Sequence, residues 1–280
     1  MTSSPAMRPH RRVWPLLALL VACSTATSPP TTSTTSTVAD QDPLTSATTS
    51  TAPAPTTTSV AAGFDVLIFH RTEGFRHTSI EAGIEAISAL GEENGFTVTA
   101  TEDPGVFSDS RLSPHEVVVF LSTTGDVLDT DQEQAMERFV AAGGGFVGVH
   151  AAADTEYEWA WYGELVGAYF EDHPEPQQAT LEVVSAGHPV IEAMPSVFER
   201  FDEWYNFRAM PGEGVTILVT VDETTYQGGK MGEPHPISWA HETLGGRSFY
   251  TAMGHTDESF AEPLMLTHLV NGILWAARRS

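Results

Sequence analysis

Short apolar runs alternate with amphipathic stretches through the first half of the region that follows residue 62. The apolar runs have the length and continuity of strands that are buried on both faces of a parallel sheet. The predicted strands are 64–70, 96–101, 116–122 and 146–150, and the predicted helices are 77–94 and 131–142. Asp129 or Thr130 caps the second helix. This alternation predicts an α/β fold, a doubly wound and mostly parallel sheet with right-handed crossovers.

Beyond about residue 178 the pattern changes to shorter strands and a final apolar helix. The predicted strands there are 179–185, 214–221, 236–240 and 247–251, and the predicted helix is 260–277. Paired glycines mark turns, but no glycine cluster has the spacing of a dinucleotide or phosphate-binding loop. We therefore expect one folded domain from residue 63 to residue 280.

The N-terminal residues read as an export signal and a linker. Three arginines precede an apolar run from 13 to 22, which is much shorter than the roughly 20 residues of a membrane span. The run ends in Leu20-Val21-Ala22-Cys23, which resembles a bacterial lipobox, in which the cysteine is acylated. We expect a lipoprotein signal peptide over 1–23, a disordered Ser/Thr/Pro linker over 24–62, and an extracytoplasmic protein anchored to the membrane by lipid at Cys23. The alternative is an ordinary cleaved signal with a chance cysteine.

The charge balance narrows the choice of partners. Residues 1 to 62 hold two of the 37 acidic and three of the 13 basic residues, which leaves 35 acidic against 10 basic in the expected domain. Such a negative field repels phosphate backbones and anionic lipid head groups. Nucleic-acid binding is therefore excluded, and membrane attachment would depend on the acyl chain.

Histidines and carboxylates gather where predicted strands end. Ligands of open α/β sheets bind outside the carboxyl ends of the strands, so residues there are the first candidates for chemistry. The candidates are His70, His77, His150, Asp154, His173, Asp202, Glu203, His241 and His255, whereas His115, His188, His235 and His268 read as structural. Histidine with carboxylate is also a ligand set for a divalent metal such as zinc. No HExxH, paired CxxC or EF-hand motif is present, so the sequence leaves the cofactor unknown.

Residues 64 to 279 resemble the ThuA-like (trehalose utilisation) family. The motifs that carry the resemblance are Gly74-Phe75-Arg76-His77, Gly143-Gly-Gly-Phe-Val-Gly-Val-His150, Phe170-Glu-Asp-His173-Pro174, His188-Pro189, Asp202-Glu203-Trp204-Tyr205, and Gly246-Arg247-Ser-Phe-Tyr250 through Gly254-His255. The resemblance implies a class I glutamine-amidotransferase-like fold, flavodoxin-like at its centre. In that fold the nucleophilic cysteine follows the fourth strand, where this chain has His150. Because the only cysteine is Cys23, glutaminase chemistry is excluded.

The resemblance also implies a carbohydrate substrate, such as a 3-keto sugar or glycoside. Its chemistry needs a base that removes a proton next to the carbonyl, and a Lewis acid or hydrogen-bond donor that holds the enolate. We assign the base to His150 or Glu203. Substrate or a metal would be bound by His77, His173, His241 and His255, and a sugar ring would stack on Trp204 and Tyr205. Trp204 stands where the family more often has an aliphatic residue, and its alternative role is an extra core aromatic.

Two other functions fit the same residues. A non-catalytic carbohydrate-binding module would use the same cleft without turnover. A metal-dependent amide or ester hydrolase would use the histidines as ligands. Whether the protein is an enzyme is therefore left open by the sequence; if it is, a lyase, isomerase or hydrolase acting on carbohydrate is expected.

Overall fold

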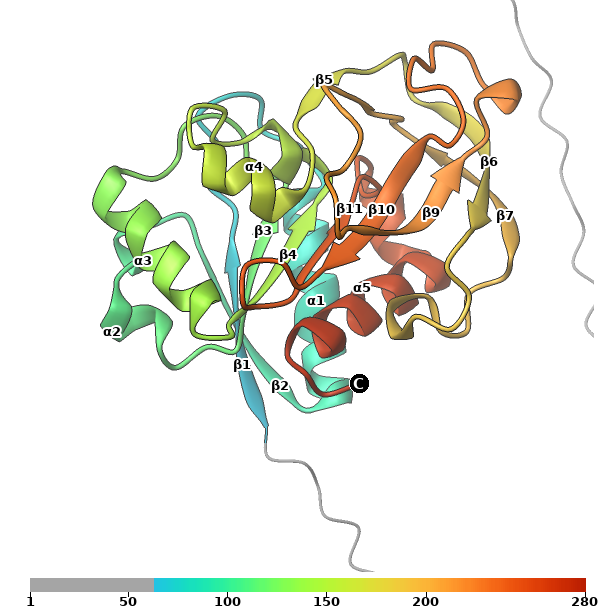
Figure 1. The fold of residues 1–280 in the computed structure, drawn as a ribbon. Coiled ribbons are helices and arrows are strands. Elements are labelled where there is room, and N and C mark those ends of the chain that lie inside the picture. The colour runs from blue at the N-terminus through green and yellow to red at the C-terminus, as the bar shows by residue number, and fades with distance from the viewer. Residues whose placement is uncertain (1–62) are drawn as a thin grey trace, which may run out of the picture. The chain divides into compact units, whose positions relative to one another are not determined.

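Five parallel strands form the central part of the sheet (Figure 1). The computed structural model describes residues 63–280; the expected signal peptide, the acylation at Cys23 and the linker lie outside these residues. The parallel strands adjoin in the order β2-β1-β3-β4-β11. Their bounds are Phe64–Phe69 (β1), Phe96–Thr101 (β2), Val117–Leu121 (β3), Gly145–Val149 (β4) and Ser248–Thr251 (β11).

Four antiparallel strands extend this sheet from β11 in the order β10-β9-β6-β7. Their bounds are Gln177–Val183 (β6), Val197–Asp202 (β7), Thr216–Val221 (β9) and Pro236–His241 (β10). Since the direction reverses at each step, β9 and β7 run in the same direction as the parallel strands, and β10 and β6 run against them. A separate small sheet joins β5 (Phe170–Asp172) to β8 (Asn206–Phe207).

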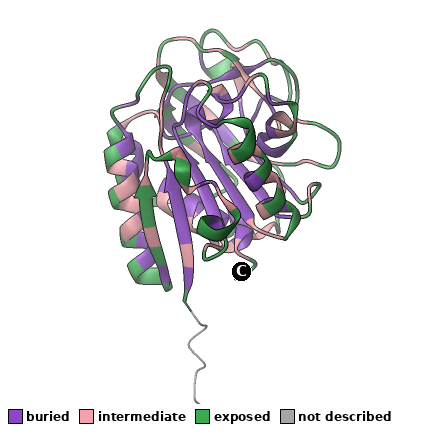
Figure 2. Cartoon of the chain, turned by 90° about the vertical axis from the view of Figure 1, so that its left-hand side faces the viewer, coloured by how far each residue is buried: buried purple, intermediate pink, exposed green. Residues whose placement is uncertain are grey.

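Helices cover both faces of the sheet (Figures 1 and 2). Their bounds are Ile80–Asn94 (α1), Asp109–Leu112 (α2), Thr130–Ala141 (α3), Ala160–Val166 (α4) and Pro263–Ala276 (α5). Helices α1 and α5 pack against each other, as do α2 and α3. None of the helices within 63–280 is long and apolar enough to cross a membrane.

Local sequence explains where the helices begin and end. Helix α1 ends at Gly95, whose φ of 79° lies in the left-handed region and whose N–H caps the Gly91 carbonyl. Helix α3 begins at Asp129, which accepts from the Gln132 N–H while the Gln132 side chain accepts from the Asp129 N–H. These ends place both helices close to the predicted ranges.

The α/β class with a parallel central sheet is confirmed, and every predicted helix and strand is present, with the predicted bounds for β2 and with shifted ends for the others. Strands β1, β3 and β4 are buried almost throughout, as their continuous apolar runs predict (Figure 2). The elements that the sequence did not predict are α2, α4, β5, β7 and β8. Strand β7 escaped prediction because the charged residues Arg200 and Asp202 occupy its buried positions.

His268 joins α5 to the sheet. Its ring is fully buried, and its nitrogens contact the Ser238 hydroxyl at 2.9 Å and the Val190 carbonyl at 3.3 Å. Burial lowers the pKa of His268 to about 4. The unfolded chain therefore binds a proton at this residue between about pH 6.5 and pH 4, whereas the folded chain does not.

Folding stability is predicted to fall as the pH is lowered through this window, by about 1.4 kcal/mol per pH unit for the one proton at His268. Urea denaturation at pH 7 and pH 5 measures the change. A His268→Gln protein should be less stable at both values but less sensitive to pH, because nothing titrates at that position. His115→Gln is the control, and an equal pH dependence in wild type and His268→Gln would contradict the assignment.

Candidate metal centre

Three imidazoles and one carboxylate converge at the carboxyl edge of the parallel strands. They belong to His77, His150, His255 and Glu203, and one donor atom from each lies within 4.8 Å of the others. Each residue follows a different strand, namely β1, β4, β11 and β7. All four strands run in the same direction, so their carboxyl ends meet at one edge. The topology thus assembles residues that are up to 178 positions apart.

The separations of the donor atoms fit a tetrahedral cation. His150 Nε2 lies 3.2 Å from His77 Nε2, 3.3 Å from His255 Nδ1 and 3.5 Å from Glu203 Oε2. Glu203 Oε2 lies 3.3 Å from His255 Nδ1. In a tetrahedral zinc site with bonds of about 2.0–2.1 Å, ligand atoms stand roughly 3.3 Å from one another. Four of the six separations are 3.2–3.5 Å and the other two are at most 4.8 Å, and three nitrogens with an oxygen are a ligand set that zinc prefers.

The backbone and ring of His150 are fixed by the last parallel strand. Its φ of 50° lies in the left-handed region, which costs a residue with a side chain about 1–2 kcal/mol. The Tyr250 hydroxyl donates to the His150 carbonyl at 2.8 Å. His150 Nδ1 lies 2.7 Å from the Ala252 carbonyl, so it carries the hydrogen and leaves the Nε2 lone pair directed into the cluster. The Tyr205 hydroxyl, 3.1 Å from Nε2, donates to that lone pair.

His77 is neutral in the folded protein. Burial, together with the neighbouring His150 and His255, lowers the pKa of His77 to about 3. Its Nδ1 is buried and has no hydrogen-bond partner among the described residues. Neutral imidazole is the form that binds a metal, so His77 is ready to act as a ligand without losing a proton.

Glu203 carries the negative charge of the cluster. Burial alone would raise the pKa of Glu203, but the close contacts with His150 and His255 outweigh it and hold the pKa below its usual range. The same contact with Glu203 raises the pKa of His255. The other carboxylate oxygen, Oε1, lies 3.0 Å from His173 Nδ1, and the His173 side chain is 40% exposed. His173 therefore connects the buried carboxylate to the solvent.

A second buried carboxylate, that of Asp202, holds two ligand loops together. Asp202 Oδ1 accepts from the backbone N–H groups of Glu203 and His255, each at 3.0 Å. Asp202 Oδ2 accepts from the Gly254 N–H and from Arg200 Nε, each at 2.9 Å. Asp202 is one of the strand-end candidates that the sequence predicts, without an assigned role. The signal for Asp202 in the sequence is that it forms a charged pair with Arg200, two positions earlier; both are buried in β7.

The structure corrects three predicted substrate contacts. His241 lies at the opposite edge of the sheet, because β10 runs against the parallel strands, and its Nε2 contacts the Leu165 carbonyl at 2.8 Å. Trp204 is fully buried and donates its indole N–H to the Gln177 carbonyl, so it offers no face to a sugar. The Tyr205 ring is buried as well and packs against the His150 ring, with centroids 4.5 Å apart.

Two further candidates lie beside the cluster without joining it. His70 follows β1 and its Nδ1 lies 3.3 Å from a Glu102 carboxylate oxygen. Asp154 accepts from the Tyr157 hydroxyl at 2.6 Å, and burial raises the pKa of Asp154. Neither contributes a donor atom to the group of four.

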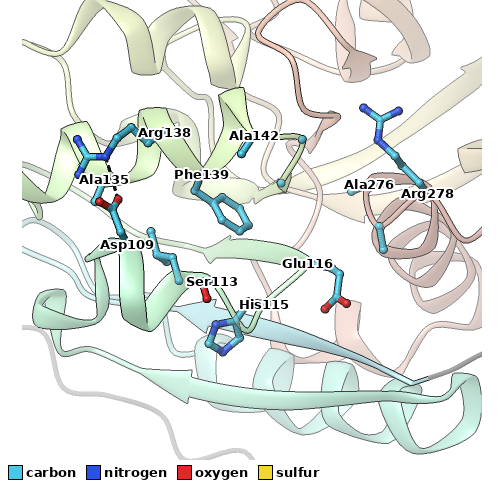
Figure 3. Close-up of a pocket in the computed structure, with 14 residues that line it drawn as sticks. Asp109, Ser113, His115, Glu116, Ala135, Arg138, Phe139, Ala142, Ala276 and Arg278 are labelled. Atoms are coloured by element: carbon cyan, nitrogen blue, oxygen red, sulfur yellow. Dashed lines mark hydrogen bonds and ion pairs between the residues drawn. The ribbon is translucent and has the colours of Figure 1, made fainter.

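A separate cavity of about 520 Å³ opens at the other edge of the sheet (Figure 3). His115 and Glu116 line it just before β3, and Phe139 lines it from α3. Arg138 Nε donates to Asp109 at 2.8 Å on its rim. This cavity contains none of the four cluster residues, so it is no part of the candidate metal centre.

We expect the purified protein to bind one zinc ion, because three imidazoles and a carboxylate already stand at ligand spacing. Isothermal titration calorimetry and metal analysis measure the stoichiometry, and zinc should also raise the melting temperature. His150→Ala should abolish tight binding, whereas His115→Ala, at the remote cavity, should bind as the wild type does. Equal zinc binding by both variants would show that the cluster is not the metal site.

Comparisons with known proteins place the chain in a family. The family model for ThuA, described as trehalose utilisation, matches residues 65–276. A ThuA-like protein of known structure from Bacteroides uniformis is 25% identical, with a TM-score of 0.69 over 80% of this chain and 95% of that one. A ThuA-like protein from Parabacteroides merdae is 20% identical, with a TM-score of 0.66 over 77% and 90%. A candidate GMP synthase protein from Thermoplasma acidophilum is 11% identical, with a TM-score of 0.48 over 77% and 94%. No match was found among curated proteins. The chain belongs to the ThuA family.

Proposed function

We propose that this protein binds an oxidised sugar at a cation held by His77, His150 and His255, and removes a proton next to the sugar carbonyl. The observation that carries the proposal is the convergence of three imidazole nitrogens and one carboxylate oxygen within 4.8 Å. The family's link to trehalose utilisation supports a sugar as the substrate. A carbonyl group is the part of an oxidised sugar that both a cation and a base can act on.

In this proposal the three imidazoles would hold the cation and Glu203 would leave it when substrate binds, so that one position of a tetrahedral cation would open, as in catalytic zinc sites. A cation held there by the imidazoles would supply Lewis acidity toward a carbonyl oxygen. The Tyr205 hydroxyl, 3.1 Å from His150 Nε2, would be free to donate to a substrate oxygen once that nitrogen binds a cation. The cluster therefore supplies both partners that an enolate oxygen requires.

Glu203 is the base in this proposal, and His150 is a ligand. His150 has no free nitrogen, because Nδ1 bonds to Ala252 and Nε2 faces the other donors. Glu203 Oε2 is ionised and stands 3.3 Å from His255 Nδ1, so it would be placed to accept the proton of the C–H bond next to a carbonyl bound at the imidazoles. The electron pair of that bond then forms the enolate. His173, bonded to the other oxygen of Glu203, carries the proton to the solvent.

Exchange of the α-hydrogen with solvent tests this function without knowledge of the final product. In D₂O, the zinc-loaded protein should replace the hydrogen next to the carbonyl of a methyl 3-keto-glucoside by deuterium, which proton NMR detects. Glu203→Gln should slow the exchange by about 10²-fold or more, because the amide accepts no proton at neutral pH. The exposed carboxylate variant Glu182→Gln, on β6, is the matched control.

Unchanged exchange in Glu203→Gln would rule out Glu203 as the base. Binding of the 3-keto-glucoside without any exchange would favour a non-catalytic carbohydrate-binding module. Hydrolysis of amide or ester substrates by the zinc-loaded protein, with no exchange, would favour the metal-dependent hydrolase.

The location of the protein is a separate proposal. We infer export and lipid anchoring from the basic and apolar residues that precede Cys23. Cells given a clickable fatty acid should label the wild-type protein and leave a Cys23→Ser variant unlabelled. Equal labelling of the two proteins would contradict acylation at Cys23.

A further inference from the structure

Phe75 is an exposed aromatic side chain at the rim of the candidate metal centre. Its exposed fraction is 67%, against 42–54% for the other four exposed large apolar side chains of the described residues. Its ring meets that of His77 edge to face, with centroids 4.9 Å apart and an interplanar angle of 83°. Phe75 thus contacts a ligand residue while most of its own surface remains open to solvent.

Hydrogen bonds hold the loop that carries Phe75. The Glu73 N–H donates to the Thr124 carbonyl at 2.8 Å, and the Gly74 N–H donates to Thr124 Oγ1 at 3.2 Å. Thr124 Oγ1 in turn donates to the Phe75 carbonyl at 2.9 Å. Contacts on three successive residues fix the backbone on both sides of the ring. The loop that follows β1 therefore holds Phe75 in its exposed position.

A fixed, exposed aromatic ring next to polar groups is suited to one part of a sugar. A pyranose ring presents C–H groups on its faces and hydroxyl groups around its edge. The C–H face can pack on an aromatic face, which removes apolar surface from water, while the edge remains free for hydrogen bonds. The buried rings of Trp204 and Tyr205 cannot provide such a surface.

We propose that Phe75 is the residue that selects a ring-form sugar, by packing against the C–H face of a pyranose whose carbonyl lies at the metal centre. This inference rests on the proposed function and adds a specificity-determining residue to it. Phe75 does not touch the reacting atoms, so its contribution is to binding.

The competing role for Phe75 is to hold the His77 ring in place. Two carbonyl compounds separate the roles. A methyl 3-keto-glucoside has both the carbonyl and the sugar ring, whereas dihydroxyacetone has a similar hydroxyketone but no ring. Loss of the sugar-packing surface affects only the first compound, and displacement of His77 affects both.

The experiment compares the zinc-loaded wild type with Phe75→Ala, Phe75→Trp and the control Phe201→Ala. Phe201 is also an exposed phenylalanine, and it points to the opposite face of β7 from Asp202. NMR titration gives the dissociation constant for each compound, and metal analysis gives the zinc content. Titration measures binding directly, so its result does not depend on turnover.

Phe75→Ala should weaken binding of the 3-keto-glucoside on the order of tenfold and change that of dihydroxyacetone by less than about twofold. Phe75→Trp should restore binding, and zinc content should be unchanged in all variants. Equal weakening for both compounds, loss of zinc, or no effect in Phe75→Ala would overturn the inference. If the wild type binds the glucoside through Phe75 but exchanges no hydrogen, the proposed function fails while the Phe75 assignment stands. If it binds neither compound, both fail.

Discussion

The buried carboxylate of Asp202 is the interaction on which the arrangement of the site depends. It accepts three backbone N–H groups and the Arg200 guanidinium, and the backbone groups belong to the loops that carry Glu203 and His255. Removing a charge from water costs several kcal/mol unless hydrogen bonds and a partner charge compensate. Asp202 has both, since its two oxygens accept four donors. A neutral side chain at this position would leave the buried Arg200 guanidinium with one carboxylate partner, Glu262, in place of two.

The same network extends from the site to the helical layer. Arg200 also contacts Glu262 at 2.6 Å, and Glu262 immediately precedes the first residue of α5. The end of β7, the loop after β11 and the start of α5 are therefore tied through one guanidinium and two carboxylates. Such charge-assisted hydrogen bonds are directional, so they set the relative positions of these segments more closely than apolar packing would. The spacing of the four donor atoms in the candidate metal centre depends on that precision.

The sequence predicted the parallel core because burial on both faces leaves a simple pattern, a continuous apolar run. Strand ends could also be placed, and with them His77, His150 and His255. Strand direction in the second half could not be read from the residues, since an apolar strand has the same pattern in either direction. His241 and His255 both follow short predicted strands, yet β10 and β11 are antiparallel, so they lie at opposite edges. The exposure of aromatic side chains could not be predicted from the sequence either. Trp204 and Phe75 are both aromatic residues within family motifs, and only the packing of the folded chain shows that Trp204 is buried and Phe75 is exposed.

Both ends of the described chain lie at the edge of the sheet opposite the candidate metal centre. Strand β1 begins there, and the Ala276 carbonyl, at the end of α5, lies against Gly145 at the start of β4 (Figure 1). Whatever is joined to the domain at either terminus is attached at that edge. The points of attachment and the candidate metal centre therefore lie at opposite edges of the sheet. The histidine cluster is thus at the far end of the domain from either point of attachment.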